Sequence, residues 1–200
     1  MLDTVVGLYP RRHEQESPAR GAIRRLSQPF EWLFALLLAL TLAGTGALVY
    51  FALAPGFGSI WLEPSNSWLV LGDDAPPAHA MSFNALPWAT QAMATAAFAL
   101  IAGSLAAAFW FLRALFQCYR DGDVFGPAPQ RHMQRAGAAL VVFALAPGAL
   151  QPVLAAVGSP DRAWFHAHSV AVLIIGAGLF VFARVVALGR EVERESKEFI

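Results

Sequence analysis

Charge and cysteine are both scarce in this chain of 200 residues. Only 14% of the residues are charged, whereas 57% are hydrophobic; roughly a quarter of the residues in an ordinary soluble domain are charged. The single cysteine, Cys118, excludes an intramolecular disulfide framework and a zinc site built from several thiolates. The arginines occur in small groups beside apolar runs, unlike the basic face of a nucleic-acid-binding domain. We therefore expect membrane lipid, and neither water nor nucleic acid, to surround most of the chain.

Four apolar runs are long enough to cross a hydrocarbon core of about 30 Å, which needs roughly 20 helical residues. They predict an all-α integral membrane four-helix bundle with spans over residues 32–53, 88–112, 136–157 and 164–186. Pro147-Gly148 and Pro152 interrupt the third run, so we expect a kinked helix there. The first run is too long and too far from the N-terminus to be a cleavable signal peptide.

Positive charge is distributed unevenly between the segments that flank these runs. All of the 14 Lys and Arg residues except Arg162 lie before the first run, between the second and third, or near the end of the fourth and beyond it. Because cytoplasmic flanks retain positive charge during insertion, we expect both termini in the cytoplasm. Residues 1–29 then form a cytoplasmic tail, predicted to be flexible. Residues 30–200 form the membrane domain, whose last helix continues into the cytoplasm over 187–200.

The loop between the first two runs has no Lys or Arg and belongs on the extracytoplasmic side. Within it, SIWLE and WLVLG flank the sequence Pro64-Ser65-Asn66-Ser67. Two short β-prone segments around turn-forming residues favour a small β-hairpin.

A polar island, CYRDGDVFGPAPQRH at residues 118–132, separates the second and third runs. Asp121-Gly122-Asp123 is expected to end the preceding helix, and Pro127 to stiffen the return. The stretch YRDGDVFGPAPQRHMQRAG resembles the signature of the bacterial membrane proteins of domain of unknown function family 2975. The matching residues are Gly122, Asp123, Val124, Phe125, Pro127, Arg131, Arg135 and Gly137. The chain departs from that signature at Pro129, where the family tends to have Asn, and at Ala128, which replaces an acidic residue.

The C-terminal stretch ARVVALGREVERESKEFI also resembles the ending of that family, so the resemblance covers roughly residues 30–200. It implies four spans in a bacterial cytoplasmic (inner) membrane and, often, a genomic neighbour that is a small helix-turn-helix regulator. It implies no established activity.

An apolar stripe with helical spacing follows the fourth run, and it includes four residues that could bind a partner helix. The stripe consists of Val181, Val185, Leu188, Val192 and Phe199, of which the last four are the candidates. We expect it to be covered by Leu115, Phe116 and Tyr119 of the same molecule, or else by a helix of another protein.

The sequence contains no catalytic, cofactor or metal-binding signature, and we predict no enzyme activity. His166 and His168 lie two residues apart, so on a helix they point in nearly opposite directions and are poorly placed to share an ion. The Asp121-Gly122-Asp123 turn lacks the further oxygen ligands of a calcium loop. Ionisable residues, which coupled transporters place at membrane depth, are missing from the centres of all four runs.

Two functions are compatible with this pattern. The leading hypothesis is a membrane partner or sensor that engages a cytosolic regulator through the polar island and the C-terminal helix. The alternative is a small oligomeric carrier or channel, since the interrupted third run could expose backbone to a solute. Small residues such as Ala99, Gly103 and Ala107 permit close helix approach within one molecule or in a homo-oligomer.

Overall fold

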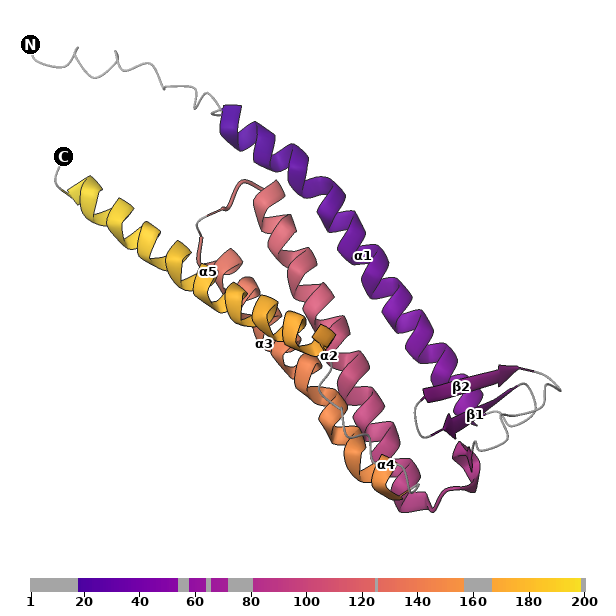
Figure 1. The fold of residues 1–200 in the computed structure, drawn as a ribbon. Helices are drawn as coiled ribbons and strands as arrows, with labels where there is room; N and C mark the ends of the chain where they lie inside the picture. Colours follow the sequence, from indigo (N-terminus) through magenta and orange to yellow (C-terminus); the bar gives the residue numbers. More distant parts are fainter. Residues whose placement is uncertain are drawn as a thin grey trace, which may run out of the picture.

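The computed structural model describes residues 18–53, 58–63, 66–71, 81–124, 126–156 and 167–198, and helices dominate it (Figure 1). The α-helices are α1 (Pro18–Leu53), α2 (Trp88–Arg120), α3 (Pro127–Leu145), α4 (Gln151–Ala156) and α5 (Ala167–Glu198). Two 3-10 helices, η1 (Phe83–Ala85) and η2 (Ala146–Leu150), precede α2 and α4.

The long helices pack in chain order. α1 lies against α2, α2 against α3, and α3 against α5. Figure 1 places the start of α1, the end of α2 and the end of α5 at one end of the bundle, and the strands and α4 at the opposite end. The turn between α2 and α3 therefore lies at the same end of the bundle as the start of α1 and the end of α5.

Three described helical segments are long and apolar enough to cross a membrane: Ile23–Tyr50, Trp88–Arg120 and Ala167–Gly189. The third predicted span is not among them, because residues 136–156 are divided between α3, η2 and α4. Pro147 lies in the first turn of η2 and has no N–H, so it cannot continue the hydrogen-bond ladder of α3.

The first helix begins earlier than the sequence pattern suggested. Residues 18–29, expected in the N-terminal tail, belong to α1, and Pro29 lies inside that helix. The segment contains Ala, Arg and Leu, which are strong helix formers, and this composition accounts for the earlier start.

Three short strands lie beyond the end of α1. β1 (Gly58–Glu63) pairs antiparallel with β2 (Asn66–Leu71) and with β3 (Met81–Ser82), in the order β2-β1-β3. The two segments expected to form a hairpin fall on β1 and β2, where Trp61 is the partner of Trp68.

Large apolar side chains lie mainly on the outside of the helices, and small residues lie between them. None of the most apolar window of α1 is buried within the chain, and Trp32 is 69% exposed. The buried positions of the bundle include Ala94, Ala108 and Ala136. Small residues at the contacts and large apolar residues outside are the arrangement that helices adopt in lipid, which does not drive apolar surfaces together.

Candidate functional site

The polar turn between α2 and α3 has a defined backbone geometry. The N–H of Asp123 donates to the carbonyl of Cys118 at 2.9 Å, and the N–H of Gly122 donates to the carbonyl of Tyr119 at 3.1 Å. Together these bonds form a Schellman motif, which satisfies the last carbonyls of a helix. Gly122 has φ of 86°, a left-handed conformation that costs glycine little. The predicted helix end at residues 121–123 therefore lies in a closed turn.

The start of α3 is fixed by glycine and proline without a side-chain cap. Gly126 is the N-cap residue and Pro127 the first helical residue. The Asp123 carboxylate lies so close to Gly126 that a Cβ there would collide with it. Pro129, one of the two departures from the signature, is fully buried. Phe125 lies outside the described residues, and Val124 is half-buried.

A buried carboxylate joins α1 to α2 at the same end of the bundle. Glu31 is 7% exposed; its Oε1 accepts a hydrogen bond from Gln117 Nε2 at 3.0 Å, and its Oε2 pairs with Arg120 at 2.6 Å. The Nε of Arg120 lies 3.5 Å from a carboxylate oxygen of Asp121. Sequence reasoning placed Glu31 only at the edge of a span, because nothing local indicates partners 86 and 89 residues away.

Aromatic rings line the same contact between α1 and α2. Phe116 stacks on Phe30 with ring centroids 5.1 Å apart and on Phe34 at 5.6 Å. Tyr119 meets the Phe116 ring edge-on at 5.9 Å. Phe116 therefore packs against α1, and the expectation that it lies against the C-terminal stripe was wrong.

The rest of that stripe also differs from the expectation. Val181, Val185 and Leu188 are 63%, 57% and 62% exposed, so they do not cover the end of α2. The structure does not describe the side chains of Val192 and Phe199. The face of α5 that packs inward instead carries Leu179 and Ala183, which cluster with Met133 of α3 and with Leu115 and Tyr119 of α2. Leu115 and Tyr119 thus contact α5 as expected, but on a different face of that helix.

Two glycines explain which face of α5 turns inward. A Cβ added to Gly137 would lie 2.8 Å from the carbonyl oxygen of Gly176, and one added to Gly176 would lie 3.0 Å from the carbonyl oxygen of Gly137. α3 and α5 thus touch through their backbones, and the face of α5 that bears Gly176 is the one that approaches α3. Gly137, a residue of the predicted motif, acts in helix packing.

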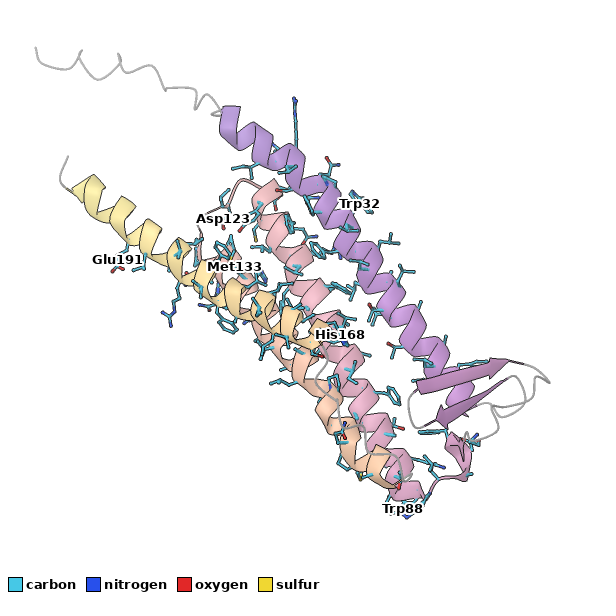
Figure 2. All side chains as sticks on the ribbon, in the orientation of Figure 1. Trp32, Trp88, Asp123, Met133, His168 and Glu191 are labelled. Carbon is cyan, nitrogen blue, oxygen red and sulfur yellow. The ribbon has the colours of Figure 1, made fainter. Side chains whose placement is uncertain are left out.

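The two arginines of the motif lie on the first turns of α3. The Nε of Arg131 donates to the carbonyl of Pro127 at 3.3 Å, and the Arg135 guanidinium carbon lies 5.7 Å from the centre of the Phe111 ring. Between them, His132 is half-buried with its ring 6.3 Å from that of Phe111. Burial lowers the pKa of His132, and the charges of Arg135 and Arg131 lower it further. Figure 2 shows Asp123 and Met133, which mark this turn and the start of α3, at the end of the bundle remote from Trp88.

Exposed charged side chains gather at this turn and on the following part of α3. Among the described residues, no three His, Cys, Asp or Glu side chains come together as metal ligands. His168 is exposed on α5, and His166 lies outside the described residues. Asp121 and Asp123 are exposed on the hydrogen-bonded turn between α2 and α3, and Arg131 is exposed on α3 shortly after it. We define these three residues as the polar corner.

Comparison with protein-family models, with curated proteins and with solved structures found no match for this chain. The family resemblance of the polar island stays a prediction.

Proposed function

We propose that this chain is a non-enzymatic membrane protein that binds a cytosolic regulator at the inner face of a bacterial cytoplasmic membrane, as its partner or sensor. In this proposal α1, α2 and α5 cross the bilayer, and α3, η2 and α4 together make a third, kinked crossing. The polar corner and both termini face the cytoplasm, α5 extends into it beyond the bilayer, and the strands face the opposite side.

The observation that carries the proposal is the fixed geometry of the polar corner. The Schellman motif closes the turn, and the Glu31–Arg120 pair fixes the end of α2 to α1. A surface that is already ordered loses little conformational entropy when a partner binds, so its charges contribute fully to affinity. Neighbouring exposed charges of both signs also favour recognition of a protein surface with complementary charges.

The expected regulator is a small helix-turn-helix protein, which the sequence resemblance suggests. Its own surface would meet the polar corner and the cytoplasmic end of α5, where Leu188 is exposed just beyond the predicted span. An amphipathic helix on the regulator could use that side chain as an apolar anchor.

A quantitative pull-down tests the proposal with the full chain in mild detergent and a helix-turn-helix protein encoded beside it. Replacing Asp121, Asp123 and Arg131 together by Asn, Asn and Gln should weaken capture at least about tenfold, because two or three charge-assisted contacts are lost. Deleting residues 189–200 should weaken it further. The matched control replaces three polar residues of the strand segment, Ser59, Asn66 and Ser67, by Ala. Capture that survives both changes at the corner and the tail would contradict the proposal.

The alternative, a small oligomeric carrier or channel, has one specific observation in its favour. The third crossing is interrupted at η2, and an interrupted helix at membrane depth exposes backbone groups that must be satisfied by protein, water or a solute. Solute flux in vesicles that is lost when Pro147 and Pro152 are replaced by Leu would favour the carrier over the regulator partner.

A further inference from the structure

Two arginines on the first turns of α3 have no acidic partner in the described structure. Arg131 and Arg135 are both exposed, and being four residues apart they lie on the same side of the helix. Arg120, at the end of α2, is paired with Glu31 and lies near Asp121. Arg131 and Arg135 form no such pair with any described carboxylate. Their positive charge is therefore available to an external anion.

The guanidinium of Arg135 has one aromatic contact. It lies over the Phe111 ring of α2 at 5.7 Å, a distance at which a cation is attracted to an aromatic face. Both arginines also act on His132 beside them: after burial, their charges are the causes that lower its pKa. This part of α3 thus carries two positive charges on one side of the helix, and one of them lies over an aromatic ring.

The position along α3 indicates which anion is within reach. Residues 136–145, which follow immediately, contain no charged side chain. The two arginines consequently stand where the chain passes from polar to apolar surroundings, the level at which lipid headgroups lie in a bilayer. Guanidinium groups match the geometry of phosphate oxygens, and basic sites at this level attract anionic lipids.

We propose that Arg131 and Arg135 bind the phosphate of an anionic phospholipid headgroup on this side of α3, with Phe111 as the residue that positions Arg135. The inference rests on the proposed placement of the chain in a bilayer, and the lipid site shares Arg131 with the polar corner. Asp121→Asn with Asp123→Asn should weaken regulator capture only, and Arg135→Gln should weaken lipid binding only, so the two proposals can fail separately.

Native mass spectrometry of the full chain in detergent, titrated with phosphatidylglycerol or phosphatidylcholine, tests the site. We expect tighter binding of phosphatidylglycerol, about fivefold weaker for either Arg131→Gln or Arg135→Gln and about 30-fold weaker for the pair, since a basic residue at a membrane surface contributes about 1 kcal/mol. Phe111→Leu keeps every charge and should weaken binding about twofold to fivefold. The charge-matched control is Arg20→Gln with Arg25→Gln on α1.

Three outcomes would overturn the site. The first is equal affinity for the two lipids. The second is an equal loss for the control pair, which would indicate general electrostatic attraction. The third is displacement of bound phosphatidylglycerol by inorganic phosphate at the same concentration, which would assign the arginines to a soluble anion.

Discussion

Glu31 sits at the edge of the apolar part of α1 and is nearly buried. Removing a carboxylate from water costs several kcal/mol, and that cost is offset only when both oxygens receive good partners. Gln117 donates a hydrogen bond to one oxygen and Arg120 donates one to the other, and both residues lie in the last turns of α2. These polar contacts set the position of α1 along α2, which apolar contacts alone specify less sharply.

Burial makes the two halves of this pair unequal. The Glu31 side chain is 9% exposed, whereas that of Arg120 is 41% exposed. Arg120→Gln leaves a buried carboxylate with no charged partner and should reduce the free energy of unfolding by about 3 kcal/mol. Glu31→Gln leaves an arginine that can reach water and should cost only about 1 to 2 kcal/mol. Equilibrium unfolding in mixed micelles measures both values.

The double variant, Glu31→Gln with Arg120→Gln, supplies the control because it removes both charges together. The double variant should lose less free energy of unfolding than Arg120→Gln alone. A larger loss for Glu31→Gln than for Arg120→Gln would show that the carboxylate is solvated and that the pair does not fix α1.

The backbone conformation at position 122, and no contact with a neighbouring atom, is what requires glycine there. Its φ is 86°, and no atom lies within 4 Å of an added Cβ. Gly122→Ala should therefore cost about 1 kcal/mol through backbone strain alone, and Gly122→Asn should cost less, because Asn enters the left-handed region more readily. Unfolding in mixed micelles checks the order. Gly103→Ala is the control, since that glycine lies in α2 with no atom near its added Cβ; an equal effect of Ala at positions 122 and 103 would contradict the strained turn.

At the scale of the helices, the crossing of α3 and α5 depends on two glycines in direct contact. Gly137→Val places side-chain atoms where the carbonyl of Gly176 now lies, so the helices must separate and lose their packing. Overpacking of this kind costs about 1 to 3 kcal/mol. We expect a reduced thermal unfolding temperature and faster proteolysis within α5.

Gly178 provides a matched control on α5, only two residues from Gly176. Nothing lies within 4 Å of a Cβ added there, so Gly178→Ala should leave the unfolding temperature unchanged or raise it slightly. If Gly137→Val proves as harmless as Gly178→Ala, the backbone contact does not hold α3 to α5.

At the level of elements, the sequence predicts features that depend on neighbouring residues and misses those that depend on distant ones. The end of α2 at Asp121-Gly122-Asp123 was predictable, because a turn depends on nearby residues. The pairing of Glu31 with Arg120 was not, since it joins residues 89 apart. The inward face of α5 was predicted wrongly because the apolar periodicity of Val181, Val185 and Leu188 signals burial in a soluble protein. Next to lipid, large apolar side chains can face outward while small ones face a neighbouring helix.

For the whole molecule, the packing order α1, α2, α3 and α5 leaves α2 as the one long helix that α1 packs against extensively in the described structure. In its most apolar window 0% of the residues are buried, so that surface needs lipid or another copy of the chain to cover it. The same arrangement brings the polar corner and the charged end of α5 to one end of the bundle and the strands to the other (Figure 1). A bilayer between those two ends would leave both sets of polar residues in water.

The single native cysteine makes this placement directly measurable. In a Cys118→Ala background, cysteines introduced one at a time at Ser67, Asp123 and Glu191 report the side of the membrane on which each residue lies. A membrane-impermeant maleimide added to intact cells should label position 67 only, because the other two positions are expected in the cytoplasm under the positive-inside rule. Permeabilised cells should allow labelling at all three. Labelling of positions 67 and 123 from the same side would contradict the membrane placement on which the polar corner and the lipid site both depend.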